Sequence, residues 1–425
     1  MEEDIGRMEI RAKEMSGEVV DPRLKYNFNL DQSVSVWSDY MKVFVDENNI
    51  FSYDDYSHLN EAQPFDVFNY GYSVFKTYDY EEEIESKLHK ITEQCDRLQG
   101  FQAFCDIDSG FAGIAEDMLS FVREEFPRAP ISFFGFYGAP KDMTRKSKAK
   151  RILNLSLSMT TLSQLCSVYF PLSHKHWDTS LHFPYLKLEK EKKFHSSAIF
   201  AAAINTLTRP YRDVTNSYTM HQFTSSLATS TERNICTLEA SFPLPLYYEQ
   251  PLNTLLNPKT DPIYATNWMY PLTPNTTRTA TVAPYSCSVV MRGVPPSSFT
   301  RSPDYSSPDQ LLQHYLSNFS CPSRESFTFN NNVPWQMPIT FPKFFSSSVS
   351  SDGLLETFNV KEGTINSAPV LVNAQTTKQS SNLVSLLANA CKDIDIGTLP
   401  EFQLQKTELH QLHDNLQHIY DLYQS

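Results

Sequence analysis

EQCDRLQGFQAFCDIDSGFAGIAEDMLSFVREEFPRAPISFFGFYGAP, the run from Glu93 to Pro140, decides the fold of this chain. Its pattern predicts the end of a helix, a strand at Phe101–Ile107, a small-residue turn, a helix at Ala112–Phe126 and a strand at Ile131–Tyr137. Strands and helices that alternate at this spacing favour a parallel sheet with helical crossovers. A turn from a buried strand into a helix N-terminus is where many nucleotide-binding proteins hold a phosphate.

Helical periodicity extends to both sides of this run. The clearest helix is predicted at Tyr80–Leu98, where apolar residues recur on one face and Gly100 follows as a stop signal. Further helices are expected at Ala149–Leu165 and Ser196–Thr208. The aromatic stretch Phe65–Phe75 is typical of an irregular, half-buried segment.

The second half of the chain has a different composition. Ser, Thr, Asn and Pro dominate residues 213–380, and short strands are predicted at Phe242–Tyr248 and Ser286–Met291. Long loops are expected at Asn253–Pro284 and Pro295–Pro308. Such a composition is typical of a mixed second domain.

Both ends of the chain have patterns of their own. Residues 1–30 are charged and acidic and are predicted to form a disordered tail, and a helix is expected at Ser33–Phe44. Two helices are predicted at Ser381–Asp393 and Pro400–Tyr423. We expect this C-terminal pair to pack onto the second domain of the chain, with an outer face that meets partners as the alternative.

These patterns together predict four parts. They are an acidic tail at 1–30, an α/β domain of nucleotide-binding type at 31–190, a mixed α+β domain with long Ser/Thr/Pro-rich loops at 191–380, and C-terminal helices at 381–425.

The composition bounds the class of function. With 425 residues the chain is long enough for two or three domains with a sizeable core. Its formal net charge of −13 argues against a nucleic-acid partner, because phosphate binding needs a basic surface. The basic cluster KDMTRKSKAKR at Lys141–Arg151 is interpreted as a solvated loop, with contact to an acidic lipid surface or partner as the alternative.

Cysteine usage and hydropathy indicate the compartment. Seven cysteines are spread singly without a CxxC pair, and their odd number argues against a closed disulfide framework. We therefore expect a reducing compartment. No stretch approaches the roughly 20 apolar residues that a membrane-spanning helix needs, so any membrane association is expected to be peripheral.

Several motifs occur in an order that resembles the tubulin superfamily, and within it the Misato family. The central ones are QC-x-x-LQGF before the first strand, the glycine-containing turn at Ser109–Gly113, and the AP that closes the second strand. Supporting segments are VWSDY at Val36–Tyr40, FPYL at Phe183–Leu186, FHSSAIFAAAI at Phe194–Ile204, TRPYR at Thr208–Arg212, FPLPL at Phe242–Leu246 and VVMRG at Val289–Gly293. The resemblance implies a tubulin/FtsZ-like α/β fold. Family members begin with a strand and a first phosphate-contacting loop before VWSDY, and we expect this first strand to be missing here.

The turn departs from the phosphate-binding pattern. Asp108–Ile114 stands where a working tubulin-type loop reads GGGTG(S/T)G, whose glycines let successive backbone N–H groups approach the phosphates. Only Gly110 clearly falls on a family glycine, and Phe111 stands where a hydroxyl would be. Like charges about 4 Å apart repel by roughly 1 to 4 kcal/mol, and four carboxylates lie near the expected phosphate position, on Asp106, Asp108, Glu116 and Asp117.

Two interpretations of this turn stay open. In the first, Ser109–Gly113 is a plain strand-to-helix turn and the chain has no cofactor. In the second, the resemblance implies weak GTP binding, with Ser109, Gly110 and Gly113 lining the phosphates and Asn154 near the tubulin asparagine that touches the guanine base. Hydrolysis is not expected, because tubulins supply an acid through an N-x-D element and RDVTNSY at Arg212–Tyr218 has none in the third place.

Other candidate sites carry less chemistry. His174, His176 and His182 cluster in SHKHWDTSLHFP, but no cysteine pair or carboxylate joins them at ligand spacing, so we predict surface histidines and no metal. Arg209 and Arg212 are candidates to pair with the acidic turn. No residue is predicted to be catalytic.

The resemblance also implies a function. Misato-like proteins are implied to regulate mitochondrial distribution, morphology and network formation, from the cytosol and the mitochondrial outer membrane. We therefore expect a non-enzymatic protein that contacts protein partners at the mitochondrial surface or the cytoskeleton. Two alternatives remain: a GTP-binding tubulin relative that polymerises, and a cytoskeletal assembly factor that contacts tubulin or its folding machinery through the C-terminal helices.

Overall fold

The computed structural model describes the chain from residue 50 onward with short gaps. These gaps are 52, 54–55, 57–63, 78–79, 139–142, 175–176, 178–184, 190–191, 214–217, 229–231, 249, 257–267, 277–283, 301–304, 306, 320–324, 339–340 and 357–364. The predicted tail 1–30 and the predicted helix Ser33–Phe44 therefore lie outside the described residues.

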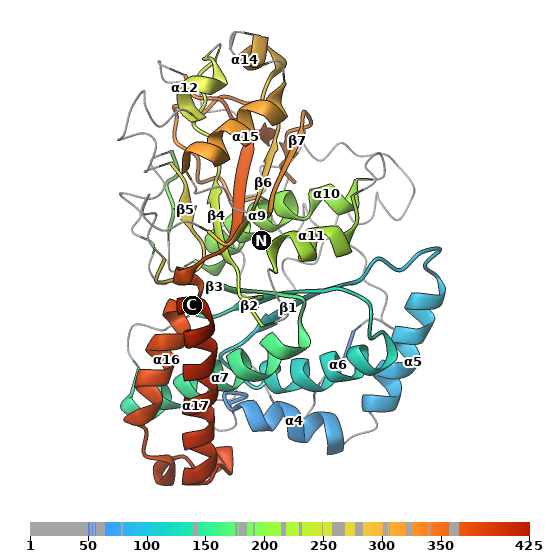
Figure 1. Ribbon diagram of the computed structural model, residues 1–425, viewed down its shortest axis with the longest axis vertical. Coiled ribbons are helices and arrows are strands. Elements are labelled where there is room, and N and C mark those ends of the chain that lie inside the picture. The colour runs from blue at the N-terminus through green and yellow to red at the C-terminus, as the bar shows by residue number, and fades with distance from the viewer. Residues whose placement is uncertain are drawn as a thin grey trace, which may run out of the picture.

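A three-stranded parallel sheet lies at the centre of the molecule, between two layers of helices (Figure 1). Its strands, in spatial order, are β1 (Phe101–Asp106), β2 (Ile131–Phe136) and β3 (Val168–Leu172). The crossovers are α6 (Phe111–Glu125) and α7 (Arg145–Leu165). The predicted strand–helix–strand unit and the parallel sheet are confirmed, because each element carries its own local periodicity.

The segment before this unit is helical where irregular structure was predicted. Phe65–Phe75 largely belongs to α4 (Phe68–Thr77), whose apolar side chains Val74 and Phe75 are buried. Gly71 lies inside this helix, where a Cβ would come within 1.9 Å of the Gly110 carbonyl oxygen. The glycine therefore allows α4 to pack closely on the start of α6.

The following helix, α5 (Tyr80–Glu93), ends before the predicted limit at Leu98. The chain turns here to enter β1, and Gly100 takes a φ of +147° that other residues rarely adopt. The Gln99 side chain donates a hydrogen bond to the Tyr211 carbonyl oxygen at 3.2 Å, which ties this turn to the other face of the sheet.

Three helices cover the opposite face of the first sheet (Figure 1). They are α9 (Lys193–Leu207), α10 (Arg209–Arg212) and α11 (Met220–Leu227). The small-residue helix predicted at Ser196–Thr208 is confirmed as α9, which is buried on most sides between the two sheets.

The second half of the chain forms a five-stranded mixed sheet, which stands above the first in Figure 1. All neighbours are antiparallel except the parallel pair β6–β7. In spatial order the strands are β5 (Tyr270–Pro271), β4 (Thr237–Ser241), β10 (Val370–Thr376), β6 (Ser286–Arg292) and β7 (Glu325–Asn331). Shorter elements surround it: α12 (Leu252–Leu256), α14 (Pro296–Thr300), α15 (Pro308–Phe319), β8 (Trp335–Gln336) and β9 (Ser367–Ala368).

The prediction of strands in this half was partly wrong. The strand expected at Ser286–Met291 is confirmed as β6, but Phe242–Tyr248 is not a strand, and the pairing ends at Ser241 in β4. Pro243 and Pro245 lack the N–H groups that a continued ladder would need. The loop expected at Pro295–Pro308 contains α14.

The C-terminal helices pack onto the first domain, not onto the second as expected. α16 (Asn382–Lys392) and α17 (Lys406–Gln424) lie beside each other against α7 at the lower left of Figure 1. Leu387 and Leu416 share a buried core with Met159 of α7. Short 3-10 turns connect them to the chain, namely η3 (Lys378–Ser381), η4 (Ile396–Thr398) and η5 (Pro400–Phe402).

The end of α17 also joins the two halves of the molecule. The buried Tyr423 hydroxyl accepts a hydrogen bond from the Ile235 N–H at 2.7 Å and donates one to the Ile235 carbonyl oxygen at 3.2 Å. Ile235 forms a β-bridge with Tyr169 of β3 and lies just before β4. One side chain therefore fixes the link between the first and second sheets to the C-terminal helix.

Candidate functional site

The predicted phosphate loop forms the turn between β1 and α6. The backbone N–H of Gly110 donates to the Phe65 carbonyl oxygen at 3.1 Å, and the Ala112 N–H donates to the Ser109 carbonyl oxygen at 3.2 Å. The Ser109 hydroxyl donates to the Asp106 carbonyl oxygen at 3.3 Å. These groups thus contact neighbouring parts of the chain.

The two glycines of this turn lie beneath the segment that leads into α4. A Cβ on Gly110 would come within 2.8 Å of the Phe65 ring, and one on Gly113 would come within 2.2 Å of the Phe68 carbonyl oxygen. Phe65 also packs edge-on against Phe111, with ring centroids 5.1 Å apart. Both glycines therefore allow two chain segments to approach each other, and Phe65 lies over the N-terminus of α6.

Asn154, the fourth predicted site residue, is fully buried on α7 beside the turn. Its Oδ1 accepts from the Phe68 N–H at 2.9 Å, and its Nδ2 donates to the carbonyl oxygens of Asp66 at 2.8 Å and Asp108 at 2.9 Å. The structure thus brings Ser109, Gly110, Gly113 and Asn154 together at one junction. There the Asn154 amide links α7, the turn and the start of α4.

The acidic part of the turn is paired with α7. Arg151 forms an ion pair with Asp108, whose Oδ2 also accepts from the Gly138 N–H at 3.0 Å. Burial raises the pKa of Asp108, although Arg151 and the Gly138 amide oppose this. Burial also raises the pKa of Asp106, and the charge of Asp108 adds to the effect.

Arg209 and Arg212 do not pair with this turn, so that hypothesis was wrong. Arg209 forms an ion pair with Asp213 at 3.0 Å, one turn further along the chain. The Arg212 Nε donates to the Thr208 hydroxyl at 3.0 Å, and its Nη2 donates to the Asn205 carbonyl oxygen at 2.8 Å. Both arginines follow α9, near the opposite end of β1 from the acidic turn.

The basic cluster Lys141–Arg151 is not a solvated loop over the part that the structure describes. From Arg145 onward it forms the first turns of α7, with the Thr144 hydroxyl accepting from the Ser147 N–H as an N-cap. Two of its lysines form ion pairs within the molecule, Lys146 with Glu401 at 2.8 Å and Lys150 with Asp66 at 3.0 Å.

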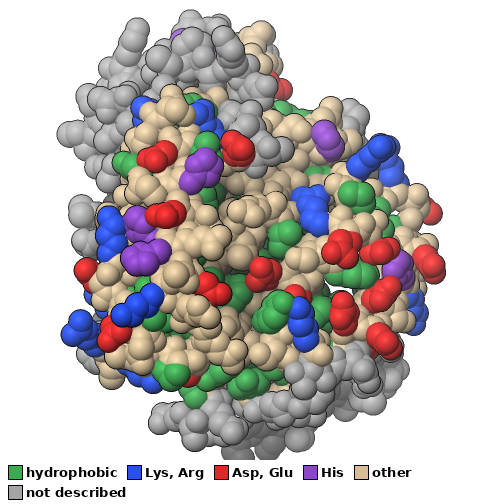
Figure 2. Space-filling view, turned by 60° about the horizontal axis from the view of Figure 1, so that its bottom comes forward, with side chains coloured by type: hydrophobic (Ala, Val, Ile, Leu, Met, Phe, Trp, Pro, Cys, Tyr) green, Lys and Arg blue, Asp and Glu red, His purple; other side chains and the backbone are tan. Residues whose placement is uncertain are grey.

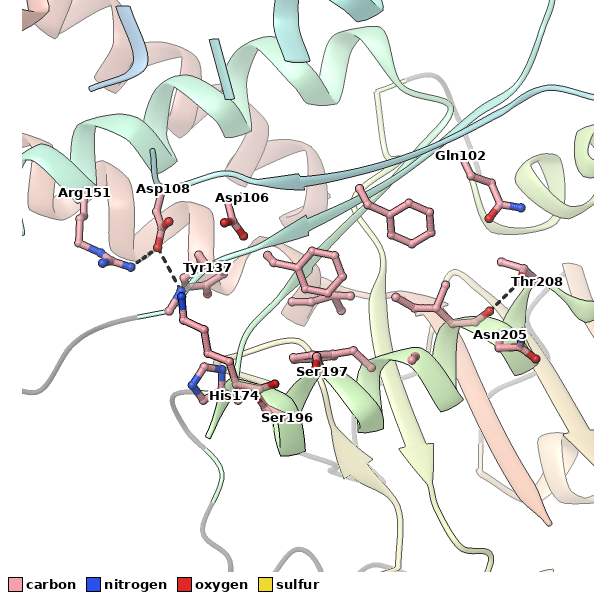
Figure 3. Close-up of a pocket in the computed structure, with 18 of the residues that line it drawn as sticks. Gln102, Asp106, Asp108, Tyr137, Arg151, His174, Ser196, Ser197, Asn205 and Thr208 are labelled. Atoms are coloured by element: carbon pink, nitrogen blue, oxygen red, sulfur yellow. Dashed lines mark hydrogen bonds and ion pairs between the residues drawn. The ribbon is translucent and has the colours of Figure 1, made fainter. Parts of the chain in front are cut away.

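A cavity of about 870 Å³ lies between β1 and α9 (Figure 3). The acidic turn forms one end, where Asp106, Asp108 and His174 lie near the start of α9. Gln102 and Thr208 lie at the other end. The cavity extends beyond the predicted phosphate loop. None of the four predicted site residues lines it, namely Ser109, Gly110, Gly113 and Asn154.

Phe104, which lines the sheet side of this cavity, is the exposed end of an aromatic ladder. The rings of Phe104, Phe134 and Phe170 stack across the three strands, with centroid separations of 5.2 and 5.0 Å. Phe134 and Phe170 are fully buried, whereas Phe104 on β1 is 55% exposed. The alternation of Gln102, Phe104 and Asp106 on one face of β1 is the sequence signal that could have found this wall.

The remaining surface offers fewer candidate sites. Among the described residues, no three His, Cys, Asp or Glu side chains gather as a metal site would require. His176 and His182 lie outside the described residues. In Figure 2 acidic side chains gather at the right, where α5 with its Glu81–Glu83 turn lies. None of the described helices combines the length and apolarity needed to cross a bilayer.

Comparison with known proteins matches both halves of the chain. The family model of the tubulin domain matches residues 28–213. Protein misato homolog 1 of Mus musculus is 28% identical over 410 residues, which cover 90% of this chain and 72% of the mouse protein. The proteins of the same name from Macaca fascicularis and Homo sapiens are 28% and 27% identical over 418 residues, covering 93% of this chain and 71% of each relative.

Proposed function

Since this chain belongs to the Misato family of tubulin-like proteins, we propose that it is a non-enzymatic protein that acts in mitochondrial distribution, morphology and network formation. The family resemblance supports a role at mitochondria. The contacts of the candidate phosphate loop support the proposal that the protein is not an enzyme. The protein would act from the cytosol and bind peripherally to the mitochondrial outer membrane through protein partners.

The contacts of the predicted phosphate loop carry this proposal. A phosphate cradle needs backbone N–H groups that face a ligand and glycines that leave room for it. Here the Gly110 N–H donates to Phe65, and the space beside Gly110 and Gly113 is filled by Phe65 and Phe68. A triphosphate at this position would have to displace the start of α4.

The charges around the loop support the same conclusion. Asp106 and Asp108 lie at the cavity end next to the loop, where they would repel a triphosphate. Arg151, the cation nearest to Asp108, is already paired with it. A nucleotide would therefore meet two carboxylates, with Arg151 already paired to Asp108 and Lys193 close to Asp106.

The segment that would activate hydrolysis in a neighbouring subunit gives no support for catalysis. Asp213 is the one acid in RDVTNSY at Arg212–Tyr218, and residues 214–217 lie outside the described part of the chain. The Asp213 carboxylate accepts from Arg209 and, at 2.9 Å, from the Asn331 side chain. It is held in the interior by these contacts.

Nucleotide content tests the loop directly. The purified full chain is denatured and its supernatant is analysed by chromatography for guanine nucleotides. In parallel, its melting temperature is measured with about 1 mM GTP and magnesium, because a ligand that binds only the folded state raises stability by mass action. We expect no nucleotide and no shift. Stoichiometric GTP or GDP, or a clear rise in melting temperature, would contradict the proposal.

The cellular role needs a separate test. The protein is depleted in cultured cells, and mitochondria and microtubules are imaged in the same cells, with re-expression of the wild-type chain as control. We expect the mitochondrial network to change while the microtubule array persists, and re-expression to restore the network. Loss of microtubules before any mitochondrial change would favour a cytoskeletal assembly factor instead.

A further inference from the structure

The cavity beside β1 has an end whose charge neither the loop nor the family membership explains. Arg209, Arg212 and Arg292 lie close together: burial lowers the pKa of Arg212 and of Arg292, the charge of Arg209 lowers both further, and Arg212 also lowers that of Arg292. Asp213 is the carboxylate bound to this group, through Arg209. In a chain with a net charge of −13, this is a local excess of positive charge.

Arg292 is the most deeply buried of the three, with 5% of its surface exposed. Its guanidinium donates to neutral oxygens, those of Val333 at 3.2 Å, Pro334 at 3.0 Å and the Asn205 side chain at 2.9 Å. Burial, with Arg209 and Arg212 nearby, lowers the pKa of Arg292 to about 10. The positive charge here is therefore only partly compensated within the described residues.

Arg212 brings this charge to the cavity. It lines the cavity, and its hydrogen bonds described above go to Thr208 and to the Asn205 backbone, which are both neutral. Asn205 connects the group, because its carbonyl oxygen binds Arg212 and its side chain binds Arg292. An anion beside Arg212 would thus lie next to Thr208 and Asn205, which also line the cavity, and the buried Arg292 is bound to the Asn205 side chain.

The middle of the cavity is apolar. Phe104, which is 55% exposed in all, lies there, and Phe136, Phe200 and Ile204 continue the wall. A volume of about 870 Å³ lies within the range that proteins use for a single organic molecule. At the far end, Asp106 and Asp108 lie beside the cations Arg151 and Lys193, so the opposite charges there are matched, whereas Arg212 lies at the other end.

We propose that this cavity binds a small organic anion, with its apolar or aromatic body on Phe104 and its carboxylate, sulfonate or phosphate group at Arg212. The anionic group would lie at the Gln102–Thr208 end in Figure 3, away from the turn at Ser109. The site is separate from the proposed role at mitochondria, which does not depend on it.

A pair of fluorescent probes tests the two halves of the site in the full-length protein. Anilinonaphthalene sulfonate carries an aromatic body and an anion, and phenyl naphthylamine has a similar aromatic body without the charge. Each is titrated by fluorescence against the wild-type chain and its variants, and inorganic phosphate is added as a competitor. Circular dichroism and the melting temperature confirm that each variant is folded.

We expect Arg212→Gln to weaken binding of the sulfonate about tenfold, since a charge-assisted hydrogen bond is lost, and to leave the neutral probe unchanged. Phe104→Ala should weaken both probes. Arg145→Gln, which removes an exposed arginine at the start of α7, is the matched control and should change neither. Inorganic phosphate should displace the sulfonate but not the neutral probe.

If the Arg212→Gln variant does not fold, a second variant tests the same basic end of the cavity. Gln102→Glu adds a negative charge at the same end of the cavity from an exposed position on β1, and it should weaken the sulfonate selectively. The proposal is overturned if the folded variants bind the sulfonate as the wild type does. It is equally overturned if Arg212→Gln and Gln102→Glu weaken the two probes by the same factor, because the charge would then play no part.

Discussion

Gly71, Gly110 and Gly113 each lie where another part of the chain fills the space of a side chain: backbone at Gly71 and Gly113, and the Phe65 ring at Gly110. A Cβ at Gly71 would meet the Gly110 carbonyl oxygen, and one at Gly113 would meet the Phe68 carbonyl oxygen. The three residues form an interlock between α4 and the start of α6. Their role in this structure is therefore close packing.

Gly113→Ala tests this interlock. Alanine normally stabilises a helix by about 1 kcal/mol relative to glycine, whereas forcing atoms into a filled space costs roughly 1–3 kcal/mol. Because the contact of 2.2 Å is with backbone, which cannot rotate away, we expect a net loss of about 1–2 kcal/mol in urea denaturation. Gly138→Ala is the control, since its Cβ would meet only the His174 ring at 3.7 Å, and its stability should change by less than about 0.5 kcal/mol. Equal stability of the two variants would contradict the packing role.

Asp117 predicts a pH dependence. Its Oδ2 is buried without a hydrogen-bond partner among the described residues, and burial raises its pKa from 3.8 to about 6. A raised pKa means that the charged form destabilises the folded state above about pH 6, and that this penalty disappears below the unfolded value near 3.8.

Asp117→Asn should therefore raise the melting temperature at pH 7.5, by roughly 1–2 °C after allowance for solvent screening. The difference between variant and wild type should shrink as the pH falls through 6 and vanish near pH 4. Calorimetry at a series of pH values measures it. A gain that persists unchanged at pH 4 would show that the carboxylate charge is not its cause.

At the scale of elements, α17 acts through its last turn as well as through its apolar face. The Tyr423 hydroxyl satisfies both backbone groups of Ile235 at the link between the sheets. Tyr423→Phe would leave these buried groups unpaired, and we expect a loss of about 1–3 kcal/mol of unfolding free energy. Tyr420→Phe on the same helix is the control, because the Tyr420 hydroxyl has no hydrogen bond within the described part of the chain. A smaller loss for Tyr423→Phe than for Tyr420→Phe would contradict the link.

The elements that the sequence predicted are those with strong local signals. β1, α6, β2, α7 and α9 each show their own periodicity, and they were found within a few residues of their limits. β3 and β10 were missed because strands buried on both faces lack alternation and depend on partners far along the chain. β4 and β7 were missed as well. Phe65–Phe75 was misjudged for a related reason, since its aromatic residues and glycine fit a helix only once α6 is packed against it.

The candidate site likewise has a part that the sequence predicted and a part that it did not. The turn at Ser109–Gly113 and its acidic neighbours follow from local sequence and from the family resemblance. The cavity joins β1 to α9, which lie about 90 residues apart along the chain, and its basic end depends on Arg292 of β6. No local pattern contains that arrangement, because it arises only when the two sheets meet around α9.

At the scale of the whole molecule, the two sheets share a core. Phe134 and Phe170 of the first sheet, Ile199 of α9, and Val290 and Val372 of the second sheet belong to one buried cluster. The C-terminal helices extend a second cluster from α7 toward β4. The parts are therefore joined by apolar surface and not by a flexible linker.

We accordingly predict that the protein unfolds as one unit. Urea transitions followed by tryptophan fluorescence, which reports on Trp177, Trp268 and Trp335 in the described part of the chain, and by circular dichroism at helix wavelengths should coincide. Both should fit a single midpoint and slope. Two separated midpoints would show that the halves fold independently despite the shared core.

Phe104 has a consequence for handling the protein at high concentration. β1 is the outer strand of the first sheet in the described part of the chain, and it displays a half-exposed aromatic ring. Outer strands of this kind are templates for pairing with another molecule, and polar residues beside them act as gatekeepers. Gln102 and Asp106 flank the Phe104 ring on the same face of β1. Replacing either residue with valine would extend the exposed apolar surface of this outer strand, and we expect the variant to aggregate more readily.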